Sequence, residues 1–407
     1  MSLPHSVTQV FGITEKHAGS QRTERMTNSI LKVNEWQSEY LSINELLKHL
    51  ARRSKSESSR QTYLRHISSF TIYTGKNPDE LINLKKKQAE IVVQRYTDSL
   101  RQNNLSIRSI NTKQNILKTF FKVNGFKGNK TLEIESHYMP SRYRKMPEYI
   151  PTKNEIYRMS ECARSLRDKA IILTLYSSGL RNSTLRAILY ENIEKELSLG
   201  YSNLLLNVFP EMKSIDPNAC KNNIPYYTFA CDEATESIKL YLIERSEKYG
   251  RIRMQDPLFP SEYNQIGRLE RQQKVLTARE LQIVIKESAK RSGIKQWQNV
   301  SPRTLRKAFE SILHSDLIDG GHLDVKVQEF LMGHILPGTQ DPYFDKTKAE
   351  EIRCLYSRLK FGRARIENKF KILKEAVTKA FEGTDIDVEK LMKEYIKSFE
   401  QCRNIGK

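Results

Sequence analysis

Apolar residues recur at helical spacing from Leu41 onward, whereas residues 1–37 are polar and show no sustained apolar period. We expect this first segment to be a tail, either a disordered leader or a binding arm. Four amphipathic helices should follow, over about 41–50, 60–74, 87–102 and 107–123. Gly75 and Gly125 stand where the second and fourth of them end, a usual place for glycine. The pattern therefore predicts an all-helical domain over residues 38–137.

A change in composition separates this domain from the rest of the chain. Residues 139–147 contain two prolines and three basic residues, Arg142, Arg144 and Lys145. Because proline disfavours the helical conformation in the residue before it, this stretch should be extended. We expect residues 138–151 to form a positively charged linker.

The second half of the chain mixes helical periods with one pair of strands. Helices are predicted at about 153–164, 166–178, 232–248 and 277–292. Residues 203–209 and 224–230 should form an antiparallel pair, since turn residues lie in the loop between them. The predicted fold class is mainly α with a small antiparallel β-sheet: an N-terminal all-α domain, then an α+β domain over residues 152–362. Helical periods continue into a C-terminal extension, residues 363–407, which either covers the second domain or docks on a neighbouring protomer.

Length and charge narrow the class of protein. A chain of 407 residues is too long for one ordinary core, and a formal net charge of +20 exceeds what solubility needs. A polyanion is therefore the expected partner. The five cysteines are odd in number and scattered, which is typical of reduced intracellular thiols and not of a zinc site. No apolar run approaches the roughly twenty residues of a membrane span, so we expect the protein in the cell interior.

Four short motifs in the second half carry candidate chemistry. They are the boxes SGLR at 178–181 and SPRTLR at 301–306, the Gly-His pair at 333–334, and a tyrosine at 343. Arginine presents a planar fork of donors that suits the charge on a phosphoryl group, and a tyrosine hydroxyl can attack such a group. The tyrosine follows the histidine by nine positions (343 minus 334). Together the motifs indicate a tyrosine that cleaves a phosphodiester.

In this order, with the apolar segment 256–260 between the boxes, the motifs resemble those of the tyrosine recombinases, the phage-type and archaeal-type integrases. The resemblance covers roughly residues 150–360 and implies that the second domain is catalytic. It implies that Arg181 and Arg306 clamp the scissile phosphate, that His334 hydrogen-bonds to it and that Tyr343 is the nucleophile. Tyr356, the next tyrosine, falls in helical sequence at the wrong spacing.

The family also uses a lysine on the hairpin to protonate the leaving 5′-oxygen. Lys213 directly follows the first strand and is the preferred candidate, and Lys221 near the second strand is the alternative. Two positions depart from the family pattern. Arg303 stands where a histidine is common, and because arginine stays protonated we expect a phosphate contact there instead of a base. Thr184 stands where the first box usually has an acidic residue.

Basic side chains of the first domain are candidates for binding DNA. The helical pattern alone allows a solvated basic face as readily as a DNA-contacting one, and the resemblance favours a core-binding domain clamped over the duplex. The candidates are Arg60, Arg65, Arg108 and Lys113 on the helices, with Arg142, Arg144 and Lys145 in the linker.

The resemblance implies a site-specific recombinase or integrase that works through a 3′-phosphotyrosyl intermediate, without a metal or nucleotide cofactor, because the intermediate conserves the energy of the broken bond. We expect double-stranded DNA attachment sites as partners, a homotetramer on DNA, a cytoplasmic, nucleoid-associated location, and an origin in an archaeal-like virus or other mobile element. One alternative is a nicking-closing enzyme similar to type IB topoisomerases. Another is a catalytically decayed recombinase that only binds DNA.

Overall fold

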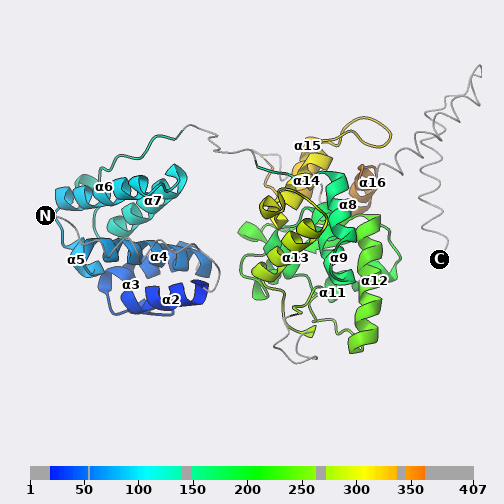
Figure 1. Cartoon of the computed structure of the whole chain (residues 1–407), viewed down its shortest axis with the longest axis horizontal. Coiled ribbons are helices and arrows are strands. Elements are labelled where there is room, and N and C mark those ends of the chain that lie inside the picture. Colours follow the sequence, from blue (N-terminus) through cyan, green and yellow to red (C-terminus); the bar gives the residue numbers. More distant parts are fainter. Residues whose placement is uncertain are drawn as a thin grey trace, which may run out of the picture. The chain divides into compact units, whose positions relative to one another are not determined.

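The computed structural model describes residues 19–53, 56–139, 148–262, 272–336, 345 and 347–362, with the side chains of residues 19–22 left out. The chain separates into two compact units, residues 1–145 and 146–407 (Figure 1). The division falls inside the segment predicted as a linker. Among the described residues, none of the helices has the length and apolar character that crossing a membrane requires.

The first unit is built from helices around one apolar core. Its helices are α2 (Gly19–Ile30), α3 (Leu41–Arg53), α4 (Glu57–Thr74), α5 (Pro78–Ile82), α6 (Lys86–Gln102) and α7 (Ile107–Val123), with a 3₁₀ turn η1 (Gly128–Lys130). The four predicted helices are confirmed as α3, α4, α6 and α7. Ile43, Leu47, Phe70 and Phe121 are at most 1% exposed and lie in the same core.

The chain is folded before the predicted start of this domain. Helix α2 packs on α4, and strands β1 (Val33–Asn34) and β2 (Gln37–Ser38) form a short hairpin where the polar pattern predicted a tail. Leu31 and Val33 are buried in the core of the unit. Polar composition hid this segment, because α2 needs only a few buried contacts on a neighbour to be stable.

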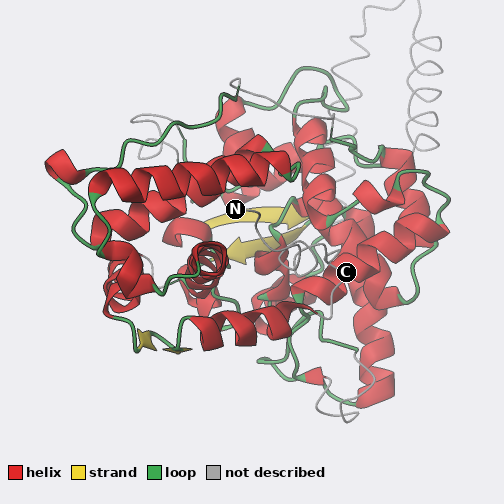
Figure 2. Cartoon of the chain, turned by 60° about the vertical axis from the view of Figure 1, so that its left-hand side comes forward, coloured by secondary structure: helices red, strands yellow, loops and turns green. Residues whose placement is uncertain are grey.

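The second unit is a bundle of helices around one two-stranded sheet (Figure 2). Its helices are α8 (Lys153–Glu161), α9 (Leu166–Ser178), α10 (Asn182–Arg186), α11 (Glu191–Ser198), α12 (Asp232–Tyr249), α13 (Ala278–Arg291), α14 (Pro302–Leu313), α15 (Val325–Leu331) and α16 (Ala349–Ser357). Strands β3 (Leu204–Val208) and β4 (Tyr226–Ala230) pair antiparallel, with Leu204 opposite Ala230. The described part of this unit also contains the short 3₁₀ turns η2 (Pro210–Ser214), η3 (Lys221–Asn223) and η5 (Trp297–Asn299). The predicted fold class, mainly α with a small antiparallel sheet, is confirmed.

Helix α9 is the centre of this unit. It is buried over most of its length and packs against α8, α12, α14 and β4. Helix α16 closes the same core, because the Tyr356 hydroxyl donates to the Ser177 carbonyl over 2.7 Å. Helix α15 packs on β4, so the segments that follow α9 and α15 both start from helix ends that are packed in the core.

Candidate active site

Two glycine turns place the first and third motifs. Gly179 ends α9 and Gly333 follows α15, each with φ of +60°, a left-handed conformation that a side chain disfavours. An added Cβ would lie 2.2 Å from the Phe309 ring at Gly179 and 2.4 Å from the Tyr226 ring at Gly333. Only glycine fits these two turns, which bring the backbone against α14 and β4.

The turn after α15 has the hydrogen bonds of a Schellman motif. The Gly333 amide donates to the Phe330 carbonyl over 2.8 Å, and the His334 amide donates to the Glu329 carbonyl over 3.0 Å. This geometry brings residues five apart next to each other. His334 is thereby held against the last turn of α15.

Arg306 connects the two glycine turns. Its guanidinium donates to the carbonyls of Gly179 and Met332, and it lies 3.2 Å from His334 Nε2. Arg181, the N-cap residue of α10, donates to the Gly333 carbonyl over 3.2 Å. Three segments far apart in the sequence are thus joined by two arginines, and Arg181, Arg306 and His334 form one cluster, as the sequence predicted. We call these three residues the arginine–histidine cluster.

Burial changes the electrostatics of this cluster. Removal from water is the largest influence on Arg306 and lowers its pKa, and the charge of Arg181 acts in the same direction. An arginine stays charged even so, and two cations in a partly desolvated position attract an anion strongly. The cluster is therefore suited to binding a phosphoryl group.

Lys213 lies in the loop between β3 and β4, next to α10, the helix that Arg181 caps. It belongs to η2, in a loop held to α10 by the ion pair of Arg186 with Asp216 and by a 2.9 Å hydrogen bond from the Ser183 hydroxyl to the Asn218 carbonyl. Burial raises the pKa of the Cys220 thiol in the same loop, and the charges of Lys213 and Arg181 oppose that rise. Both cations therefore lie within electrostatic range of one sulfur atom.

The alternative lysine has a different setting. Lys221 is exposed at the start of η3, on the far end of the loop. Lys213, unlike Lys221, shares an electrostatic neighbour with Arg181, the Cys220 thiol. The role of either lysine stays a prediction.

Arg303 is on the same helix as Arg306 but is not part of the cluster. Its side chain is 76% exposed and lies 3.7 Å from Glu148. Thr184, the other departure from the family pattern, is buried, and its hydroxyl has no hydrogen-bond partner among the described residues. Position 184 therefore has no carboxylate and position 303 has no imidazole, the groups that the family pattern would place there.

Glu329 is a site residue that the sequence analysis missed. Its carboxylate lies 2.7 Å from His334 Nδ1, on the face of the imidazole opposite Arg306. The sequence did contain a signal for Glu329. A Schellman turn places the residue after the helix-ending glycine next to the residue five positions before it, and here these two residues are His334 and Glu329.

The predicted nucleophile, Tyr343, lies outside the described residues, as do Arg142, Arg144 and Lys145 of the linker. Tyr356 is fully buried, and burial raises the pKa of its hydroxyl well above the ordinary value. Tyr356 therefore cannot serve as the nucleophile in this structure.

The basic candidates of the first unit differ from one another. Arg65 and Arg108 are exposed on α4 and α7, and Lys113 is half-buried on α7. Between these helices lies a groove lined mainly by polar groups: Ser58, Ser59, Thr62, Tyr63, Thr112 and Asn115, with Ile116. Hydroxyl and amide side chains of this kind can donate to phosphates and to base edges. We call this surface the α4–α7 groove.

The prediction that Arg60 contacts DNA was wrong. Its side chain is only 7% exposed, it pairs with Glu57, and it donates to the Glu35 carbonyl beneath the Trp36 ring. These contacts satisfy the guanidinium within the protein, so Arg60 supports the β1–β2 hairpin instead. Glu57, three residues before Arg60 on the same helix, was the signal in the sequence that Arg60 could form an ion pair within the protein.

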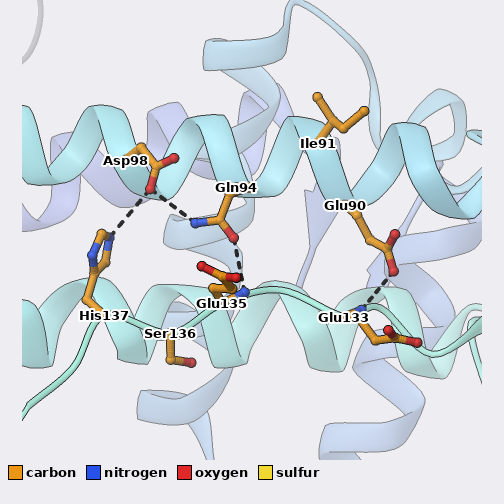
Figure 3. Close-up of a pocket in the computed structure, with 8 residues that line it drawn as sticks. All are labelled: Glu90, Ile91, Gln94, Asp98, Glu133, Glu135, Ser136 and His137. Atoms are coloured by element: carbon orange, nitrogen blue, oxygen red, sulfur yellow. Dashed lines mark hydrogen bonds and ion pairs between the residues drawn. The ribbon is translucent and has the colours of Figure 1, made fainter.

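A second groove of the first unit is acidic. It lies between α6 and residues 133–137 and is lined by Glu90, Ile91, Gln94, Asp98, Glu133, Glu135, Ser136 and His137 (Figure 3). Its carboxylates partly bind the neighbouring backbone: Glu90 accepts from the Glu133 amide over 2.8 Å. This groove repels a polyanion and is unsuited to facing DNA.

Known proteins are similar to this chain in sequence. Residues 152–350 match the phage integrase family. A tyrosine recombinase XerD of Rickettsia bellii (strain RML369-C) is 27% identical over 297 residues, which cover 70% of this chain and 87% of the relative. A tyrosine recombinase XerA of Pyrococcus horikoshii is 25% identical over 308 residues, covering 74% of this chain and 87% of the relative.

A solved structure gives a weaker likeness. The XerH site-specific recombinase, bound to its palindromic difH substrate in a post-cleavage complex, aligns with a TM-score of 0.49 at 15% identity over 86% of this chain and 93% of its own. The family match contains every residue of the arginine–histidine cluster. Residues 152–350 form a domain of the phage integrase family, and the chain is a tyrosine recombinase.

Proposed function

We propose that the chain cleaves and rejoins double-stranded DNA at specific sites, with Tyr343 as the nucleophile. The Tyr343 oxygen forms a bond to the scissile phosphorus while its proton passes to water, and the bond from phosphorus to the 5′-oxygen breaks. The product is a 3′-phosphotyrosyl bond and a free 5′-hydroxyl. Attack by a 5′-hydroxyl of another strand reverses these steps and reseals the DNA, so no energy source is consumed.

One observation carries this proposal: Arg306 donates to both glycine turns and lies against His334, with Arg181 beside it. The donors are in position before DNA arrives, and preorganised donors stabilise charge more effectively than donors that must be ordered during the reaction. In this proposal Arg181 and Arg306 bind the nonbridging phosphate oxygens and His334 contacts one of them. Lys213, which like Arg181 acts electrostatically on Cys220, gives its proton to the leaving 5′-oxygen.

A nicked suicide duplex tests the nucleophile. The duplex is selected from a random-sequence pool by binding to the wild-type chain, and a nick close to the scissile bond traps the intermediate because the short product diffuses away. We expect a covalent protein–DNA adduct that is absent in Tyr343→Phe, while Tyr356→Phe still forms it. An adduct in Tyr343→Phe would overturn the assignment of the nucleophile.

The same experiment separates the alternatives. A catalytically decayed module would bind the selected duplex and form no adduct. A nicking-closing enzyme would relax a supercoiled plasmid without exchanging strands between two duplexes. We expect recombinant products from two labelled duplexes that each carry the selected site.

The first unit is proposed to hold the duplex through the α4–α7 groove. Arg65, Arg108 and Lys113 lie on the two helices that form it, and the polar lining supplies hydrogen bonds. Arg142, Arg144 and Lys145 are proposed to contact the backbone from the linker. Chemical footprinting of the selected duplex, with each variant compared with wild type, checks which contacts are lost.

The finer parts of the proposal concern assembly and origin. We propose a homotetramer that pairs two DNA sites, a cytoplasmic protein associated with the nucleoid, and a role in integrating or excising a viral or other mobile element. Mass photometry of the chain with and without the selected duplex tests the tetramer. A repeat of the selected site beside the chain's own gene supports the mobile element, and a single chromosomal site elsewhere contradicts it.

A further inference from the structure

We propose that Glu329 is a positioning residue that sets the protonation of His334, through an acid–histidine pair at the C-terminal end of α15. The inference rests on the proposed function, because it concerns the contact of His334 with a phosphate. Glu329 does not touch that phosphate in this proposal. It acts through the imidazole.

The two neighbours of His334 determine which ring nitrogen carries the proton. Arg306 can only donate, and it lies 3.2 Å from Nε2, so Nε2 must accept. The Glu329 carboxylate can only accept, and it lies 2.7 Å from Nδ1, so Nδ1 must carry hydrogen. Both contacts select the same neutral tautomer, protonated at Nδ1, in the protein without DNA.

The main chain holds this pair in register. The His334 amide donates to the Glu329 carbonyl, so the backbone and side chain of Glu329 both contact the same residue. Gly333 permits the turn, and the Tyr226 ring packs against it. A carboxylate so placed needs little reordering to bind the imidazole, which makes the contact effective.

A bound phosphate changes what His334 must do. In the proposed complex an anionic oxygen lies between Arg306 and Nε2 while Arg306 keeps its carbonyl contacts, and a neutral Nε2 would present a lone pair to that oxygen. His334 therefore takes up one proton from solvent, donates from Nε2 to the phosphate and donates from Nδ1 to Glu329. The charges around it are Arg306 from α14 and Arg181 from the start of α10, which oppose the imidazolium, with Tyr226 from β4 neutral and Glu329 from α15 in favour.

Nitrogen-15 NMR of the full-length chain without DNA tests the pairing directly. Histidine is labelled, and the signals of His334 are identified by their loss in His334→Gln. We expect the wild type to show a protonated Nδ1 and an unprotonated Nε2, and Glu329→Ala to lose this preference. Glu329→Gln retains an acceptor oxygen without the charge and should keep the tautomer.

A matched control separates positioning from helix stability. Asp324 caps α15 by accepting from the Lys326 amide, and it lies at the opposite end of the helix from His334. Asp324→Ala should weaken the helix and leave the His334 tautomer unchanged. The inference is overturned if Glu329→Ala keeps the wild-type tautomer, or if Asp324→Ala alters it equally.

Proton uptake tests the second half of the inference. Calorimetric titration with the selected, unnicked duplex, in two buffers of different ionisation enthalpy, gives the number of protons taken up on binding. We expect the wild type to take up more protons than Glu329→Gln. In that variant the rate constant of adduct formation on the nicked duplex should fall about ten- to a hundredfold, with duplex affinity unchanged. Equal uptake in both proteins would contradict the role of Glu329.

The two levels of proposal fail in different ways. If the tautomer follows Glu329 but the wild type forms no adduct, the pairing stands and the recombinase reaction is refuted. If the wild type forms the adduct while the tautomer ignores Glu329, the reaction stands and this inference is refuted.

Discussion

The cations of the two units are held in opposite ways. In the second unit, Arg181 and Arg306 donate to main-chain carbonyls of two glycine turns and are partly or largely buried. In the first unit, Arg65 and Arg108 stand exposed on helices beside a polar groove. A buried, oriented guanidinium can stabilise charge at one point, whereas an exposed one can follow a phosphate backbone. Under the proposed function, this difference assigns catalysis to the second unit and DNA affinity to the first.

The largest expected effect comes from removing the residue that joins the glycine turns. Arg306→Ala should lower the rate of adduct formation about a hundredfold or more, with DNA affinity kept within about tenfold, because the fixed donors act mainly on the transition state. Quenched-flow adduct formation and fluorescence anisotropy measure the two quantities.

Arg303→Ala is the matched control for Arg306, from the same helix. Its exposed side chain should contribute to affinity and much less to rate. Equal losses of DNA affinity and of reaction rate in Arg306→Ala would mean that Arg306 serves mainly to bind DNA. The contrast between the cations of the two units would then be wrong.

The glycine turns should respond to a single methyl group. Gly333→Ala combines a left-handed backbone with a clash against the Tyr226 ring, and we expect a loss of about 3 kcal/mol in the free energy of unfolding. Gly200 has a similar φ of +77° with open space around it, so Gly200→Ala should cost only about 1 kcal/mol. Urea unfolding of both variants measures the difference. Similar losses would show that packing on Tyr226 is unimportant.

Substitutions in the first unit should change the salt dependence of binding. Arg65→Ala and Arg108→Ala should each lower affinity a few-fold and reduce the slope of log K against log salt by about one, with the rate of adduct formation on bound DNA unchanged. Lys86 is the control, because it pairs with Glu133 beside the acidic groove. An equal change of slope in Lys86→Ala would mean that DNA binding depends on the total positive charge of the unit and not on the positions of Arg65 and Arg108.

The smallest expected effect concerns acid stability of the first unit. Burial, with help from Lys113 and Arg65, lowers the pKa of His66 from 6.5 to about 4. The unfolded chain therefore binds a proton at His66 more readily than the folded chain does. The contribution of His66 to the free energy of unfolding is fully present above pH 6.5 and is lost as the pH falls from 6.5 toward 4. His66→Gln should flatten that part of the stability curve, measured by thermal unfolding at a series of pH values. An unchanged curve would assign the acid sensitivity to other groups.

Local patterns were enough to predict most of the fold. Ser106 and Thr277 cap α7 and α13 by accepting amide hydrogens, and Gly75 ends α4 in the left-handed conformation, so these boundaries could be read from neighbouring residues. The hairpin of β3 and β4 followed from its two apolar runs. Helix α2 was missed because its stability comes from contacts with α4, which no local pattern contains.

The site was predictable where the motif is local and unpredictable where a partner is distant. The arginine boxes and the Gly-His pair carry their own signal, and the structure brings Arg181, Arg306 and His334 together. The burial of Arg60 depends on the hairpin around Trp36, and the carbonyl partners of Arg306 depend on tertiary packing. These contacts are set by which helices meet, and a sequence taken one segment at a time does not contain that information.

The acceptors of Arg306 belong to the main chain, which every residue type carries. Met332 can be exchanged for another apolar residue without removing the oxygen that the guanidinium binds. The arginine–histidine cluster therefore depends more on the shape of the backbone at the two glycine turns than on the side chains beside them.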